Sequence, residues 1–167
     1  MSGIDPAVHG RKRIPHLLLR PDGSTARAII RSVRPPLAHF AQELGTLDEM
    51  TQNTTVRSFL AESAIRTTSN FAITADDIVG VQWASSPTST PANAAGITVP
   101  ALVMVMSCHY FIVPGEIVYD HLASRDRTYA AVEGASHMFA PCRPQYGDTV
   151  KRTFDFVDAW LSKPSRF

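Results

Sequence analysis

The chain has 167 residues, of which 44% are hydrophobic and 19% charged, and its formal net charge is +1. This composition fits one ordinary globular domain, and the balanced charge gives no electrostatic reason to expect nucleic acid or an anionic membrane as a partner. No apolar run reaches the roughly 18 residues that span a bilayer, and the first residues lack the apolar core of a signal peptide. We therefore expect a cytoplasmic protein that binds neither nucleic acid nor membrane.

A β-hairpin is predicted near the N-terminus. Residues 14–20 and 26–33 are two extended runs on either side of Pro21-Asp22-Gly23. Proline presets φ in a tight turn and glycine accepts a positive φ, so this pattern is typical of a hairpin. A helix over residues 25–33 is the alternative.

Helical signals follow the hairpin. Residues 37–44 come after two prolines and stop at Gly45, which predicts a short helix. Thr46 and Glu49 have the spacing of a capping box and predict the start of another helix, which fades into polar residues at 66–70.

Residues 78–83 form a further extended candidate. The Ser/Thr/Pro-rich residues 83–93 then predict a surface connection, because they are too small and polar to pack by themselves.

The clearest order of strand, loop and helix signals lies in residues 97–139. The unbroken apolar run 101–106 predicts a strand that is buried on both faces of a parallel sheet. A short crossover helix with Pro114 near its start follows, and residues 128–132 predict a second strand.

Polar loops come directly after both of these strands, at residues 107–110 and 133–137. The carboxyl ends of adjacent parallel strands meet at one edge of a sheet, which is where open α/β sheets bind ligands. We therefore expect a functional site at this edge.

An amphipathic helix is predicted from Asp148 to Leu161, with Asp148 as its N-cap. Its apolar positions recur at helical spacing and predict one stripe that is buried against a sheet. They are Val150, Phe154, Val157, Trp160 and Leu161.

Three features resemble the C-terminal part of the α/β-hydrolase family. They are Ile97-Thr98-Val99-Pro100, Glu133-Gly134-Ala135-Ser136-His137 and the helix over residues 148–161. In that family a penultimate strand carries the triad acid in the loop after it, and the final strand ends before the general-base histidine. The resemblance covers residues 97 to 163 and does not extend to the first half of the family's fold.

The resemblance implies an α/β fold class with a partial α/β-hydrolase-like parallel sheet, flanking helices and an N-terminal cap-like hairpin and helical region. We divide the chain into a hairpin and cap-like region with its linker, residues 1–96, and a C-terminal βαβα unit, residues 97–167. By analogy, a helical cap would occupy residues 35–80.

The resemblance assigns the general-base role to His137. An imidazole can take a proton from a nucleophile and return it to a leaving group at neutral pH; a loop histidine bonded to backbone is the alternative. The acid position is taken by His109, which cannot do the work of a carboxylate. Either Glu116 or Asp120 supplies the acid, or the site needs none, and Glu116 would also suit the dipole of the helix start.

No G-x-S-x-G nucleophile elbow occurs in the sequence. A base without a positioned nucleophile gives little catalysis. We predict an ester or acyl hydrolase type of protein for a small-molecule, ester-like substrate, with His137, His109 and Glu116 as candidate catalytic residues, no cofactor and no nucleophile in this chain. The alternative is a non-catalytic binding or interaction module, a pseudo-enzyme on the same fold.

The two cysteines, Cys108 and Cys142, are too few for a disulfide scaffold and predict reduced thiols. A bridge is the alternative, because the predicted fold brings both near one sheet edge. With His109 and His137 they form a set that suits Zn²⁺, but adjacent positions at a strand end point in opposite directions. We expect no metal.

Two parallel strands are too few to cover the predicted helices, so the strand at 101–106 would keep an unpaired edge. Unpaired edges bind other chains. We therefore expect a homo-oligomer or a complex with a partner half-domain.

Overall fold

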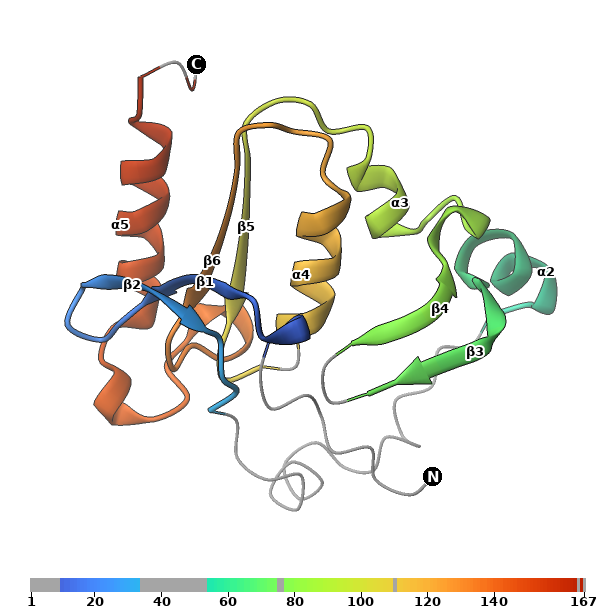
Figure 1. Cartoon of the computed structure of the whole chain (residues 1–167). Helices are drawn as coiled ribbons and strands as arrows, with labels where there is room; N and C mark the ends of the chain where they lie inside the picture. Colours follow the sequence, from blue (N-terminus) through green and yellow to red (C-terminus); the bar gives the residue numbers. More distant parts are fainter. Residues whose placement is uncertain (1–9, 34–53, 75–76, 110, 165, 167) are drawn as a thin grey trace.

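Four strands form the central sheet of the protein in the order β2-β1-β6-β5 (Figure 1). The computed structural model describes residues 10–33, 54–74, 77–109, 111–164 and 166. The strands of this sheet are Pro15–Leu19 (β1), Thr25–Ile29 (β2), Ala101–Met106 (β5) and Arg127–Val132 (β6). The predicted α/β class is confirmed, with a mixed sheet and helices.

β5 and β6 are parallel neighbours, as predicted, from Ala101 opposite Arg127 to Met106 opposite Val132. The crossover between them contains α4 (Ile112–His121), since parallel strands cannot be joined by a tight turn. Both strands therefore end at the same edge of the sheet.

The predicted N-terminal hairpin is also confirmed, and the helical alternative for it is wrong. β1 pairs antiparallel with β2, and it pairs in parallel with β6 through the register Leu17–Ala130 to Leu19–Val132. The turn contains Gly23 at φ 82°. β1 thus occupies the second edge of β6, and among the strands of the described residues β5 stands at the edge of the sheet.

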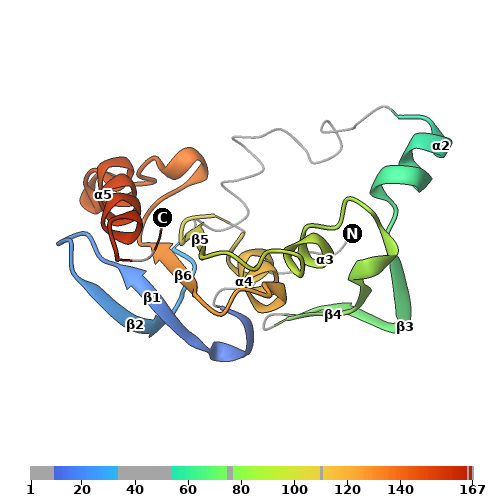
Figure 2. The same cartoon turned by 90° about the horizontal axis from the view of Figure 1, so that it is seen from above.

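Helices cover the two faces of this sheet (Figures 1 and 2). Val132 lies in a core cluster against which Phe156 of α5 (Thr149–Leu161) packs, whereas Ala131 lies in a second cluster with Ile112 of α4. Alternate residues of a strand point to opposite faces. β6 is therefore buried on both faces, which explains its apolar sequence.

α5 begins after its predicted N-cap, Asp148, but it buries only part of the predicted stripe. Trp160 is buried as predicted, whereas Phe154 is 66% exposed and Thr149 and Thr153 are buried instead. The two threonine hydroxyls donate to the carbonyls of Phe139 and Thr149, at 2.6 and 2.7 Å. A threonine whose hydroxyl is hydrogen-bonded can be buried at little cost, so the buried face is not the all-apolar one that was predicted.

A second, two-stranded sheet lies on the other side of α4 from α5 (Figures 1 and 2). Its strands are β3 (Arg66–Ile73) and β4 (Ile78–Gln82). Short helical elements precede and follow them in the chain: α2 (Val56–Ser58), a π-helical turn at Phe59–Ser63, a 3-10 turn at Trp83–Ser85 and α3 (Thr90–Ala94).

The extended prediction for residues 78–83 is confirmed by β4, but β3 occupies residues 66–73, where the sequence predicts a polar end of a helix. β-branched residues such as Thr67 favour a strand there. Residues 83–93 contain α3 as well as a connection. The predicted helix at 37–44 and the capping box at Thr46 lie outside the described residues.

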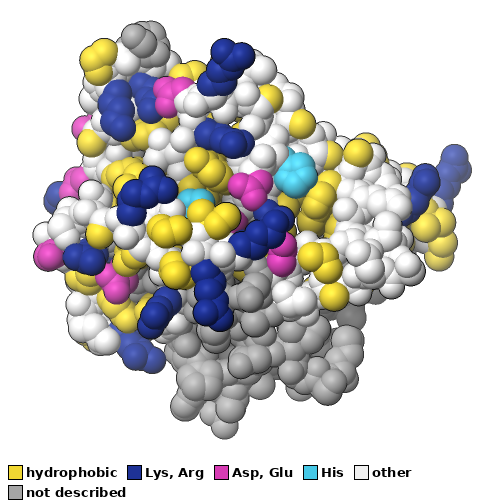
Figure 3. Space-filling model, in the orientation of Figure 1, with side chains coloured by type: hydrophobic (Ala, Val, Ile, Leu, Met, Phe, Trp, Pro, Cys, Tyr) yellow, Lys and Arg dark blue, Asp and Glu magenta, His cyan; other side chains and the backbone are white. Residues whose placement is uncertain are grey.

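No helix in the described part of the chain is long and apolar enough to cross a bilayer. On the face seen in Figure 3, basic and acidic side chains are interspersed.

The α5 packing gives a test with a matched control. We expect Phe156→Ala to lower the free energy of unfolding by about 2 to 3 kcal/mol, because this ring packs on the core cluster. Phe154→Ala, the same change on the exposed face of the helix, should cost no more than about 0.5 kcal/mol. Urea unfolding measures both, and equal losses would mean that α5 faces the sheet differently.

Candidate functional site

The loops after β5 and β6 are joined to each other by hydrogen bonds. The Cys108 N–H donates to the Ala135 carbonyl, and the Gly134 N–H donates to the Ser107 hydroxyl, both at 2.9 Å. These contacts run between two segments that the parallel pairing has already brought to one edge. The expectation that both polar loops meet there is confirmed.

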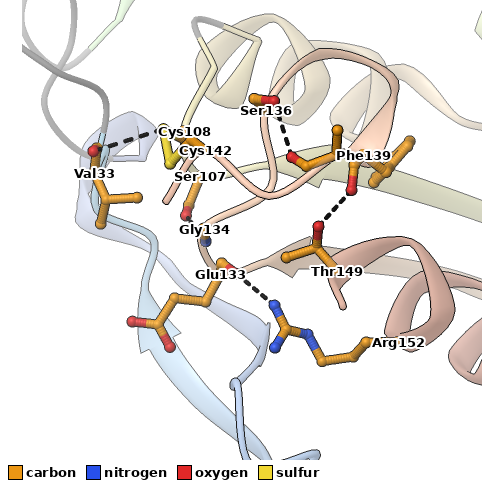
Figure 4. Close-up of a disulfide and its surroundings, with 11 residues drawn as sticks. Val33, Ser107, Cys108, Glu133, Gly134, Ser136, Phe139, Cys142, Thr149 and Arg152 are labelled. Atoms are coloured by element: carbon orange, nitrogen blue, oxygen red, sulfur yellow. Dashed lines mark hydrogen bonds between the residues drawn. A yellow bond between two sulfur atoms is a disulfide. The ribbon is translucent and has the colours of Figure 1, made fainter. Parts of the chain in front are cut away.

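A disulfide joins Cys108 and Cys142, whose Cα atoms are 6.4 Å apart (Figure 4). The prediction of reduced thiols is therefore wrong and the alternative of a bridge is confirmed. Shared sheet-edge placement brings the two cysteines within bonding range, and the Cys142 N–H also donates to the Gly134 carbonyl at 2.9 Å. The bridge ties the residue before His109 to the segment after His137.

His137 starts a short turn whose backbone is unusual. Met138 and Phe139 have φ of 61° and 60°, in the left-handed region that non-glycine residues seldom adopt. The turn is held by Thr149, whose hydroxyl donates to the Phe139 carbonyl. Strained backbone of this kind tends to occur at functional sites, where the surroundings hold it in place.

The structure brings His109 and His137 together. Their rings are stacked, with centroids 5.3 Å apart and planes 29° apart. His109 is 6% exposed, while His137 is exposed, and the Phe111 ring packs against His109 at 4.6 Å. A stacked imidazole does not offer His137 the in-plane acceptor that a triad carboxylate offers.

Glu116 is only 2% exposed and contacts the N-terminal turn. One carboxylate oxygen accepts from the Arg11 backbone N–H, and the other lies 3.4 Å from His16 Nε2. Burial raises the pKa of Glu116 to about 7, the Arg11 N–H opposes this shift, and the nearby Asp120 carboxylate adds to it. The contacts of Glu116 thus lie with Arg11 and His16, apart from the histidine pair.

Asp120, the other candidate acid, belongs with Glu116 to a polar cluster around Arg11 that also contains His16 and Asp77. The Arg11 guanidinium donates to Asp120 at 2.5 Å and to Asp77. Burial lowers the pKa of His16. The cluster therefore holds three segments together, namely the turn Arg11–Arg13, α4 and the start of β4.

The serines near the site are engaged with backbone. The Ser107 hydroxyl accepts from Gly134 and is buried, and the Ser136 hydroxyl donates to the Ala140 carbonyl at 2.9 Å. Neither occupies a strand-to-helix elbow, where a nucleophile would be exposed.

The cysteines of the two-Cys, two-His set are oxidised, so the set does not offer thiolates to Zn²⁺. Among the described residues, no group of three or more His, Cys, Asp or Glu is placed to hold a metal ion.

An apolar cavity of about 500 Å³ lies beside β5. Phe111 is part of its lining and also contacts His109, so the cavity adjoins the histidine pair. This cavity could not be predicted from local sequence patterns, because its walls come from four separate elements, β4, α3, β5 and α4.

The sequence pointed to both histidines but missed what positions them. The Ser107 hydroxyl and the disulfide brace the His137 loop. One sequence signal could have predicted the bridge. Cys108 directly precedes His109, in a loop predicted to lie at the same sheet edge as the loop before Cys142.

Comparison of the chain with protein-family models, with curated proteins and with solved structures finds no match.

The brace on the His137 loop can be tested at Gly134. This residue has φ 75°, and an added Cβ would lie 1.9 Å from Cγ of the Tyr146 ring. We expect Gly134→Ala to lower the free energy of unfolding by about 3 kcal/mol or more, because it adds both backbone strain and a clash. Gly23→Ala is the control.

Gly23 has φ 82° but no atom within 4 Å of an added Cβ, so only the strain of about 1 kcal/mol applies. Chemical denaturation measures both variants. Equal, small losses would show that the loop does not pack against Tyr146.

The buried Glu116 predicts a pH dependence of stability. Its folded pKa of about 7 lies above the ordinary value of 4.5, so its contribution is fully present below about pH 4.5 and is lost as pH rises through about 7, a change of about 3 kcal/mol. Glu116→Gln cannot titrate, and we expect it to be more stable than wild type at about pH 8.5 and close to it at about pH 4.5.

The readout is the difference between variant and wild type, because the lowered pKa of His16 acts in the opposite direction below about pH 6.5. Glu62→Gln, at an exposed glutamate, is the control. A Glu116→Gln difference that does not change with pH would mean that Glu116 is not buried in the folded state.

Proposed function

We propose that this chain is an α/β-hydrolase-like protein of the ester or acyl hydrolase type, with His137 as general base and the nucleophile supplied from outside the chain. The observation that carries the proposal is the placement of His137, an exposed imidazole at the carboxyl end of β6 that is stacked on His109 at the end of β5. An imidazole in such a position can accept a proton from an incoming nucleophile.

The rigidity of the loop supports a base role. A general base works only when it is held within hydrogen-bond reach of the group it deprotonates. The Cys108–Cys142 bridge and the hydroxyl of Thr149 both hold the segment that carries His137.

His109 stands where the resemblance places the triad acid. It can orient the His137 ring by stacking, but a second imidazole does not stabilise an imidazolium as a carboxylate does. Glu116 remains a candidate only through a rearrangement, because its carboxylate contacts Arg11 and His16. We therefore propose that the isolated chain catalyses poorly.

A non-catalytic binding module is the second candidate. It is favoured by the imidazole at the acid position and by the engaged hydroxyls of Ser107 and Ser136. In this case the histidine pair and the cavity would recognise a small ester-like ligand without turning it over.

Association with a second copy or a partner half-domain is part of the proposal. The separate β3–β4 sheet has only two strands, which are marginally stable alone. Phe71, Ile73 and Val79 of that sheet are 46%, 48% and 37% exposed. Exposed apolar side chains on a two-stranded sheet favour contact with another chain.

The cytoplasmic location remains a prediction. The Cys108–Cys142 disulfide favours an oxidising compartment instead, because cytosolic thiols are normally kept reduced.

An added nucleophile tests the proposed role of His137. In water, the oxidised chain should show no His137-dependent burst of p-nitrophenolate from p-nitrophenyl acetate, because none of the described serines near the site occupies a nucleophile position. With trifluoroethanol added below its unfolding concentration, we expect wild type to form trifluoroethyl acetate at least about ten-fold faster than His137→Ala, a modest general-base effect. Gas chromatography of the product measures the exchange.

His121→Ala, which removes an imidazole from α4, is the control and should behave as wild type. Equal exchange by wild type and His137→Ala would contradict the base role and favour the binding module. A His137-dependent burst in water would contradict the absence of a nucleophile.

A further inference from the structure

The cavity beside β5 has the size of a small-molecule site. Its volume is about 500 Å³, and ligand pockets in proteins span roughly 300 to 1,000 Å³. Its walls come from four parts of the chain, represented by Ile78 of β4, Pro91 of α3, Val105 of β5 and Val118 of α4. A partly open hollow whose walls come from elements so far apart in sequence exists only in the folded chain.

The lining of the cavity contains no charged side chain among the described residues. Thr90 and Trp83 are the two lining residues that carry a polar side-chain atom, and the rest are aliphatic, methionine, proline, glycine or phenylalanine. Burying an ion in such surroundings is costly, whereas an uncharged apolar group is favoured. The cavity therefore selects against a ligand that carries its charge inside it.

The edge of β5 supplies backbone hydrogen-bonding groups to the same cavity. The N–H groups of Ala101 and Ser107 donate to carbonyls on the β6 side, at 2.9 and 3.2 Å. Backbone groups alternate in direction along a strand, so the N–H and carbonyl of Met104, between them, point to the open edge. Met104 lines the cavity, which gives a ligand carbonyl a donor to bind.

We propose that this cavity is a binding site for an uncharged molecule with a medium-length apolar chain and one carbonyl group, the chemistry of an acyl ester. The chain would lie against Val105 and Val118, and the carbonyl near the β5 edge. This deepens the proposed function, on which its role as a substrate site rests, because Phe111 joins the cavity to His109. The binding itself needs no catalysis.

An added β-strand from another chain is the competing occupant, since β5 is an edge strand. Thr90 and Pro91 of α3 line the cavity together with the β5 edge. An added strand would compete with these two residues for the space beside β5, which favours a small molecule.

Methyl octanoate, as an uncharged probe, and octanoate, as the same chain with a charge, test the proposal on the oxidised full chain. We expect methyl octanoate to bind and to change the tryptophan fluorescence, because Trp83 lines the cavity. Trp83→Phe should remove this response. Octanoate at neutral pH should bind at least about ten-fold more weakly, since no cation stands among the described lining residues to meet its carboxylate.

Two substitutions fill the cavity. Val118→Phe on α4 and Thr90→Phe at an exposed position of α3 should each weaken methyl octanoate binding at least about ten-fold, measured by calorimetry. Val150→Phe, on the solvent side of α5, adds the same ring elsewhere and should bind as wild type. Thr90→Phe keeps the test decisive if Val118→Phe does not fold, because its site is exposed.

The outcomes separate this proposal from the proposed function. Methyl octanoate binding that persists in His137→Ala, without His137-dependent exchange of the acetate ester, would support the cavity and contradict the base role. His137-dependent exchange without methyl octanoate binding would do the reverse. Three results would overturn the cavity proposal. The first is equal binding of both probes, and the second is unchanged binding in both filled variants. The third is a dimer, detected by sedimentation over a range of protein concentrations, whose formation abolishes binding.

Discussion

The parallel pairing of β5 with β6, closed at its carboxyl end by the Cys108–Cys142 bridge, is the constraint on which the rest of the structure depends. Parallel neighbours end at one edge, so the loops that follow them must meet there. Hydrogen bonds between Cys108 and Ala135 and between Gly134 and Ser107 then make the two loops one unit. The stacking of two histidines follows from this arrangement.

The polar cluster around Arg11 and Glu116 connects the walls of the β5 cavity to each other. Asp77, which accepts from the Arg11 side chain, directly precedes Ile78, a wall of the β5 cavity. Because Arg11 also binds Asp120 of α4, the cluster holds one cavity wall against the other. Glu116, which accepts from the Arg11 backbone N–H, is thus connected to the walls of the cavity more directly than to the histidine pair.

Sequence reasoning succeeded where a local pattern has one physical meaning. The unbroken apolar run Ala101–Met106 predicted a strand of a parallel sheet, and it forms β5. Asp148 predicted a helix N-cap, and its side chain caps α5. It failed where the outcome depends on distant partners. The burial of Glu116 depends on Arg11, 105 positions away, and the burial of Thr149 at the start of α5 depends on the Phe139 carbonyl in the loop after β6. Neither partner can be recognised from the sequence around the residue that it satisfies.

The joining of the two loops is tested most directly by mapping the thiols of the native protein. Free thiols are alkylated at the moment of cell lysis, and the unreduced protein is digested and examined by mass spectrometry. A cross-linked peptide pair containing Cys108 and Cys142, with neither residue alkylated, is the predicted result. Full alkylation of both cysteines in the folded protein would contradict the braced loop pair and, with it, the fixed position of His137.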